Sequence, residues 1–150
     1  MNDNNTVELL LVEDSPEDLE LALYALKKAN LANHIQVARD GVEALEFIFC
    51  EGKFAGRQIT DHPKVILLDL KLPKVDGIAV LKRLKNDLRT KMIPVVVLTS
   101  SKQQSDLVAT YQLGVNAYIV KPVNFERFTE AVRELGLFWM LLNQAPASGT

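Results

Sequence analysis

Short, mostly apolar runs separated by amphipathic segments constrain the fold of this chain more than any other feature. Four such runs, rich in leucine and β-branched residues, lie at residues 7–12, 65–68, 95–98 and 117–120. Runs of this length and composition are typical of strands that are covered on both faces, as in a parallel sheet. A weaker strand is expected at residues 35–38, where Ile35 and Val37 alternate with polar neighbours.

Segments with helical spacing of apolar residues lie between these strands. The first helix is expected to begin after Ser15, a good N-cap, with Pro16 at its first position and with Glu17 and Asp18 favoured by the positive helix end. Further helices are expected at about residues 42–51, 78–87 and 104–113 and from residue 125 onward, with a surface loop at 52–63. Repeated β-α units with short connections predict a three-layer, doubly wound α/β fold.

The length and composition of the chain limit the classes of protein to which it can belong. A chain of 150 residues predicts one domain over residues 1–150. Its formal net charge of −2 argues against a nucleic-acid binder that acts through bulk positive charge. No apolar run approaches the roughly 18 residues that a membrane helix needs, and no secretory signal is visible, so a cytoplasmic protein without a membrane segment is expected. One cysteine, Cys50, excludes an internal disulfide framework.

Charged or hydroxyl side chains directly follow each of the four stronger strands. They are Glu13, Asp14, Asp69, Thr99 and Lys121. The carboxyl ends of parallel strands meet at one edge of a sheet, where ligands bind in open α/β folds, so these side chains are expected to converge. Clustered carboxylates need a compensating charge, which Mg²⁺ or a lysine supplies. Because carboxylates form acyl phosphates, such a site suits phosphoryl transfer.

Other phosphate and hydrolase chemistries lack their motifs. The sequence has no GxxxxGK[ST] loop, no GxGxxG after a strand, no GxSxG elbow and no HExxH. A phosphatase with an aspartate nucleophile would need a second aspartate two residues after Asp69, and Lys71 stands there. The missing second acid favours a phosphoacceptor over a turnover enzyme. Each strand-end motif taken singly is an ordinary turn or a solvated charge, whereas the ordered set favours a functional site.

Four segments carry a resemblance to a known family. They are LLLVEDSPED at the first strand, ILLDLKLPKVDG at the third, VVVLTSS at the fourth and AYIVKPVN at the fifth. Together they resemble the receiver domain of two-component response regulators over almost the whole chain. The resemblance implies a flavodoxin-like (βα)5 fold with a five-stranded parallel sheet of order 2-1-3-4-5. It also implies a phosphoacceptor that assists its own phosphorylation and dephosphorylation, not an enzyme.

The resemblance implies a role for each matching acidic residue. Asp69 matches the phosphoacceptor, and Glu13 and Asp14 match the acidic pair that holds Mg²⁺, or Mn²⁺, together with Asp69 and the backbone carbonyl of Lys71. The pair is Glu-Asp where many receivers have Asp-Asp, and Asp14 is the better candidate for a direct ligand.

Four further positions match other residues that the family has in common. Thr99 and Lys121 match the pair that contacts it, and Thr99 with Tyr118 matches a switch in which an aromatic ring turns inward. Pro122 matches a proline that usually follows a cis peptide bond.

The last helix has an unusual composition. Residues 7–135 are expected to form the receiver core, 136–144 to extend the helix and 145–150 to fray. Near the end of the helix the residues become apolar almost all round, which predicts a homodimer or partner surface. Its residues are Phe138, Trp139, Met140 and Leu141. Folding of this extension back onto its own domain is the alternative.

The tail, the loop at 52–63 and the lack of an effector domain resemble single-domain receivers that pair with bacterial and cyanobacterial phytochrome histidine kinases. The expected function is acceptance of a phosphoryl group on Asp69 from a sensor histidine kinase, with signalling by protein contact. The alternatives are a constitutive dimeric scaffold with the receiver fold and a chemotaxis-type receiver.

Overall fold

A computed structural model describes residues 7–28, 34–99, 112–115, 117–121, 126–127 and 130. Most of the expected helix at 104–113 and most of the helix from 125 onward lie outside these residues. So do Pro122 and the expected partner surface. Within the described residues, no helix has both the length and the apolar character needed to cross a membrane.

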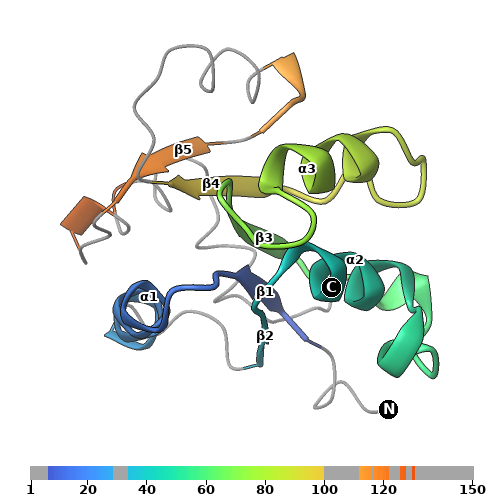
Figure 1. The fold of residues 1–150 in the computed structure, drawn as a ribbon, viewed down its shortest axis with the longest axis horizontal. Coiled ribbons are helices and arrows are strands. Elements are labelled where there is room, and N and C mark those ends of the chain that lie inside the picture. The colour runs from blue at the N-terminus through green and yellow to red at the C-terminus, as the bar shows by residue number, and fades with distance from the viewer. Residues whose placement is uncertain are drawn as a thin grey trace, which may run out of the picture.

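A parallel sheet forms the centre of the molecule (Figure 1). Its strands are β1 (Leu9–Val12), β2 (Ile35–Ala38), β3 (Val65–Asp69), β4 (Val95–Thr99) and β5 (Ala117–Val120). The predicted α/β fold with parallel strands in the order β2-β1-β3-β4 is confirmed. Strand β5 pairs with the outer side of β4, where Val120 lies opposite Thr99.

Three described helices cover the two faces of the sheet (Figure 1). Helix α1 (Pro16–Lys28) lies on one face, and α2 (Gly41–Phe49) and α3 (Gly77–Lys85) lie on the other. Successive residues of β1 point to opposite faces, so Leu9 and Leu11 pack toward α1 while Leu10 packs toward α2 and α3. Burial on both faces explains why β1 and β3 are continuously apolar up to the acidic residue at the end of β3.

Side-chain caps fix where the helices begin. The predicted cap of α1 is confirmed, because Ser15 Oγ accepts a hydrogen bond from Asp18 N at 3.3 Å. Asp40 Oδ1 accepts from Glu43 N at 2.7 Å at the start of α2. Asp76 Oδ1 accepts from Ala79 N at 2.9 Å at the start of α3. Each helix therefore leaves its strand at a defined residue.

Helices α2 and α3 end about two residues earlier than the sequence pattern predicts. Cys50 takes a left-handed conformation with φ of 57° and stops α2. Helix α3 stops before Asp87, whose carboxylate accepts from Arg89 N at 2.8 Å and forms a local turn.

The segment after α2 is more ordered than a plain surface loop. It contains two short 3-10 turns, Gly52–Phe54 and Ile59–Asp61. The Arg57 guanidinium lies 3.7 Å from the ring centre of Phe47, donates to the carbonyl oxygen of Phe47 and donates to that of Asp61 at 2.8 Å. This arginine therefore ties the second turn, Ile59–Asp61, to α2.

Candidate functional site

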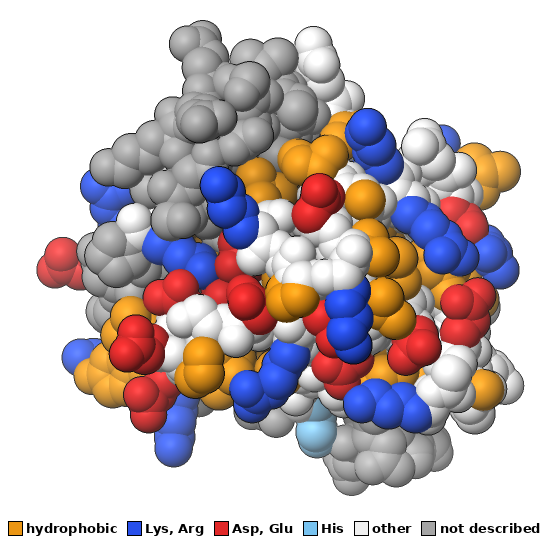
Figure 2. Space-filling model, viewed as in Figure 1, with side chains coloured by type: hydrophobic (Ala, Val, Ile, Leu, Met, Phe, Trp, Pro, Cys, Tyr) orange, Lys and Arg blue, Asp and Glu red, His pale blue; other side chains and the backbone are white. Residues whose placement is uncertain are grey.

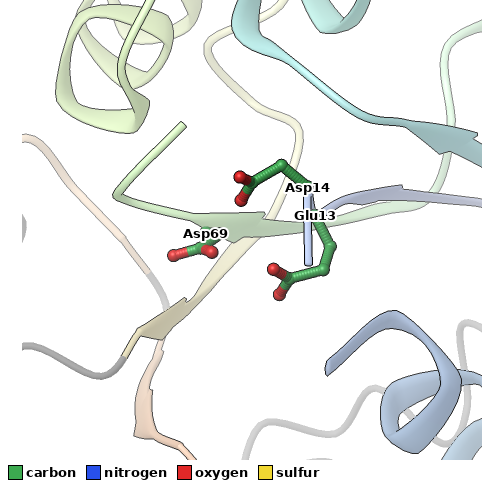
Figure 3. Close-up of side chains that lie close together, drawn as sticks. All are labelled: Glu13, Asp14 and Asp69. Carbon is green, nitrogen blue, oxygen red and sulfur yellow. The ribbon is translucent and has the colours of Figure 1, made fainter. Parts of the chain in front are cut away.

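The strand register brings two acidic segments to the same edge of the sheet. Val12 of β1 lies opposite Leu68 of β3, so Glu13 and Asp14 leave the sheet beside Asp69, the last residue of β3. One carboxylate oxygen from each of the three residues lies within 4.8 Å of the other two. Figure 3 shows the three carboxylates grouped around the end of β3, with that of Asp14 above the ribbon in this view and those of Glu13 and Asp69 below it. Glu13 and Asp69 are buried and Asp14 is exposed.

Lys121, directly after β5, supplies the positive charge at this edge. Its Nζ lies 2.8 Å from Glu13 Oε1 and 2.9 Å from Asp69 Oδ2. A third carboxylate, Asp18 in the first turn of α1, has Oδ2 at 2.8 Å from the same nitrogen. The structure therefore brings together four of the residues expected from the sequence and adds Asp18. At the sequence level, the helix dipole alone explains an acidic residue at position 18.

Burial and charge shift the protonation of these groups. Burial raises the pKa of Glu13 from 4.5 to about 7; the hydrogen bond from Lys121 opposes this shift and the charge of Asp69 adds to it. Burial alone would lower the pKa of Lys121, but its hydrogen bonds to Asp18, Glu13 and Asp69 raise it above the usual lysine value. Lys121 is therefore a permanent cation.

Figure 2 shows acidic side chains gathered over α1 and the adjoining part of this face, with basic ones between them.

Backbone contacts hold the two buried carboxylates in place. Glu13 Oε2 accepts from Ser15 N at 3.2 Å, so both of its oxygens have protein partners. Asp69 Oδ1 accepts from Lys71 N at 3.2 Å while Oδ2 faces Lys121. The orientation of the Asp69 carboxylate is thus fixed from two sides.

The start of α3 packs directly against the end of β3. Gly77 N donates to Leu70 O at 2.8 Å, and a Cβ atom at position 77 would lie 2.3 Å from Asp69 O. Only glycine fits this close approach between two backbone segments. Beside it, a pocket of about 510 Å³ is lined by residues that include Asp14, Lys71 and Asp76.

The donor set fits a hard divalent cation. Mg²⁺ and Mn²⁺ prefer oxygen ligands, and the three clustered carboxylates supply them. Both oxygens of Glu13 and both oxygens of Asp69 already have protein partners, whereas Asp14 is exposed at the pocket, so Asp14 is the best placed direct ligand. Lys71 lines the same pocket, which places its backbone beside the cluster.

The remaining expected residues are placed by their backbone alone. Thr99 ends β4, one residue beyond Leu98, which lies opposite Asp69. Tyr118 lies in β5 opposite Val97. The contacts of these two side chains lie outside the described part of the structure, as do Pro122, Phe138, Trp139, Met140 and Leu141.

The fold and this site are those of a phosphoryl-accepting signalling domain, and comparison with known proteins agrees. Residues 9–133 match the model of the response regulator receiver domain. The chain belongs to this family.

Two curated relatives and two solved structures show where the chain lies within the family. It is 40% identical over 139 residues to the probable methanogenesis regulatory protein FilR2 of Methanothrix harundinacea, covering 92% of this chain and 86% of FilR2. It is 38% identical over 140 residues to response regulator Rcp1 of Synechocystis, covering 93% of each. The Mn²⁺-bound structure of Rcp1 superposes with a TM-score of 0.76 over 94% of this chain and 99% of that one. The bacteriophytochrome response regulator RtBRR is 51% identical, with a TM-score of 0.82 over 93% of this chain and 84% of that one.

Proposed function

We propose that this receiver accepts a phosphoryl group on Asp69 from a sensor histidine kinase and signals by contact with other proteins. The observation that carries the proposal is the environment of the Asp69 carboxylate. The carboxylate is buried, oriented by Lys71 N and Lys121 Nζ, and lies beside the carboxylates of Glu13 and Asp14. The five-stranded sheet supports the same proposal, because Lys121 directly follows its outer strand β5 and reaches Asp69.

The proposed step needs an ionised nucleophile and a defined direction of attack. Lys121 Nζ lies beside one oxygen of the Asp69 carboxylate, and the contact with Lys71 N orients the other oxygen. An Asp69 oxygen forms a bond to phosphorus as the bond between phosphorus and the imidazole nitrogen of the donor breaks. With a proton on the other imidazole nitrogen of the donor, the transfer leaves an acyl phosphate on Asp69 and a neutral histidine on the kinase.

The metal proposed for this site is Mg²⁺, or Mn²⁺, as in the Mn²⁺-bound Rcp1 structure. A divalent cation neutralises charge on the phosphoryl oxygens and orients the transferring group. Asp14 and Asp69 would be direct ligands, with the backbone carbonyl of Lys71, and Glu13 would complete the acidic cluster.

The proposed partner is a phytochrome histidine kinase, which would place the chain in light signalling in the cytoplasm. The likeness to RtBRR, at 51% identity, supports this pairing. FilR2, at 40% identity, shows that a regulator of a different process is also similar, so the pairing needs its own test.

The proposed output is a change of protein contacts. Thr99 and Tyr118 would transmit the phosphorylated state, and a homodimer would form through Phe138, Trp139, Met140 and Leu141. We propose one receiver domain over residues 1–150, with a core of 7–135. A constitutive scaffold is the second candidate, because a dimer surface could operate with no phosphoryl group present.

The test of phosphoacceptance uses phosphoramidate as a small donor in the presence of Mg²⁺. Intact-mass spectrometry should show the gain of one phosphoryl group by the wild type and by Asp61→Asn, an exposed control in the 3-10 turn at 59–61. Asp69→Asn should gain none. A phosphorylated Asp69→Asn variant would overturn the proposal.

Two further measurements separate the alternatives. An autophosphorylated bacteriophytochrome kinase should transfer its label to the wild type faster than an unrelated histidine kinase does, and equal rates would contradict the pairing. Sedimentation with Mg²⁺ and beryllofluoride should shift the mass of the wild type but not of Asp69→Asn. A dimer under every condition would favour the scaffold.

A further inference from the structure

The ammonium group of Lys121 has as many carboxylate partners as it has donors. It carries three N–H groups. Its Nζ lies 2.8 Å from Glu13 Oε1, 2.8 Å from Asp18 Oδ2 and 2.9 Å from Asp69 Oδ2. A phosphoryl oxygen that forms a full hydrogen bond with Lys121 must therefore replace one of these three partners.

The three carboxylates differ in how easily they can be released. The side chains of Glu13 and Asp69 are 2% and 5% exposed, and that of Asp18 is 32% exposed. A buried carboxylate that loses its cation must either keep an uncompensated charge in a medium of low dielectric constant or take up a proton. Asp18 can take up water instead, and it lies in the first turn of α1, where the helix dipole favours a negative charge. Asp18 is therefore the partner that is released at the lowest cost.

Asp18 also stands apart from the acidic cluster that suits a cation. That cluster, within the described residues, consists of Glu13, Asp14 and Asp69. Asp18 reaches the site through Lys121, because its carboxylate shares the ammonium group with Asp69. Its effect on phosphoryl chemistry must then act through the position of Lys121.

We propose that Asp18 is a positioning residue that competes with the phosphoryl group for Lys121 and so weakens retention of that group on Asp69. This inference rests on the proposed role of Asp69 as phosphoacceptor. In the unmodified site Asp18 holds Lys121 on the side of α1. When a phosphoryl group arrives, Lys121 exchanges Asp18 for a phosphoryl oxygen, and the Asp18 carboxylate becomes hydrated.

The test measures the affinity for beryllofluoride, which coordinates the Asp69 carboxylate and stands in for the phosphoryl group. Binding is followed by fluorine NMR at saturating Mg²⁺ in wild type, Asp18→Asn and Glu17→Gln. The isosteric Asp18→Asn variant should bind about three- to tenfold more tightly, since one charge-assisted contact no longer competes. Glu17 lies in the same turn, is exposed and makes none of the three contacts with Lys121, so Glu17→Gln should stay within about twofold of wild type.

Salt concentration distinguishes competition for Lys121 from a general loss of negative charge. The gain in Asp18→Asn should persist at about 1 M salt, where the Debye length is about 3 Å and long-range repulsion is screened. A gain in beryllofluoride affinity that disappears at high salt, or an equal gain in Glu17→Gln, would overturn the proposal that Asp18 competes for Lys121. Equal or weaker binding by Asp18→Asn, with normal binding by the wild type, would overturn this inference alone. Absence of binding by the wild type would overturn the proposed function and this inference with it.

Discussion

Lys121 Nζ lies 2.9 Å from Asp69 Oδ2, although β4 lies between the strands that carry the two residues. The lysine side chain thus spans the end of β4 and is 9% exposed. This contact joins the outer strand β5 to the centre of the sheet and neutralises part of the acidic cluster.

Replacing Lys121 by methionine should destabilise the metal-free protein. Glu13 and Asp69 would remain buried side by side without their cation, and the free energy of unfolding should fall by about 3 kcal/mol. Mg²⁺ should then stabilise Lys121→Met more than it stabilises the wild type, because it supplies the missing positive charge. Urea unfolding with and without Mg²⁺ measures both effects. Lys91→Met, at an exposed position, is the control, and an equal loss in the two variants would contradict the account.

Removal of the two acidic side chains that follow β1 should have unequal effects on metal binding. Asp14→Asn should lower the affinity for Mg²⁺ by about tenfold or more, because Asp14 is the exposed carboxylate at the pocket. Glu13→Gln should lower it less, since both Glu13 oxygens already have partners within the protein. Titration calorimetry with Mg²⁺, with exposed Glu20→Gln as a charge control, gives the ranking. A larger effect of Glu13→Gln would reverse the assignment of the direct ligand.

A methyl group at position 77 should disturb both the fold and the site. In Gly77→Ala the new Cβ would lie 2.3 Å from Asp69 O and 2.5 Å from Leu70 Cα, so the end of β3 or the start of α3 must move. We expect a loss of about 2 kcal/mol in the free energy of unfolding and slower phosphorylation by phosphoramidate. Gly56→Ala, where the added Cβ meets nothing within 4 Å, should change both properties little. Wild-type behaviour of Gly77→Ala would show that the packing is looser than described.

Because of the side-chain cap of α2, the stability of the fold should decrease as the pH falls into the acid range. The hydrogen bond from Glu43 N, reinforced by Lys74, lowers the pKa of Asp40 below its ordinary value of 3.8. A carboxylate whose pKa is lower in the folded state stabilises the fold above its unfolded pKa, and this stability is lost as pH falls through the folded pKa. At neutral pH Asp40→Ala should cost about 1 kcal/mol.

The matched variant for this prediction is Asp40→Asn, which keeps a capping oxygen but has no charge to titrate. Thermal unfolding from neutral pH toward acid should show the difference between wild type and Asp40→Ala shrinking below about pH 4. The difference between Asp40→Asn and Asp40→Ala should stay constant. A wild-type advantage that is independent of pH would contradict the role of the ionised cap.

Local sequence patterns were sufficient to predict the sheet and the meeting of its strand ends. Continuous apolar runs marked β1, β3 and β4, and the rule that parallel strands share one carboxyl edge placed Glu13 near Asp69. The cap of α1 at Ser15 was also readable, because its signal lies within one turn.

What the sequence did not predict depends on tertiary contacts or on unusual backbone geometry. The contact of Asp18 with Lys121 joins residues 103 positions apart, and a local effect already accounts for an acid at a helix start. The early end of α2 depends on the left-handed backbone conformation of Cys50, which glycine or asparagine usually adopts at this position. The order of the segment after α2 depends on Arg57, whose stacking on Phe47 leaves no periodic trace in the sequence.

The most direct test of the central claim is to locate the phosphoryl group on the chain. After reaction with phosphoramidate and Mg²⁺, borohydride reduces an acyl phosphate on aspartate to homoserine, and peptide mass spectrometry identifies the residue that was modified. We predict homoserine at position 69 in the wild type, none at that position without donor, and none in the Asp69→Asn variant. Homoserine at Asp14 or at another aspartate in place of Asp69, or no modified residue at all, would contradict the account.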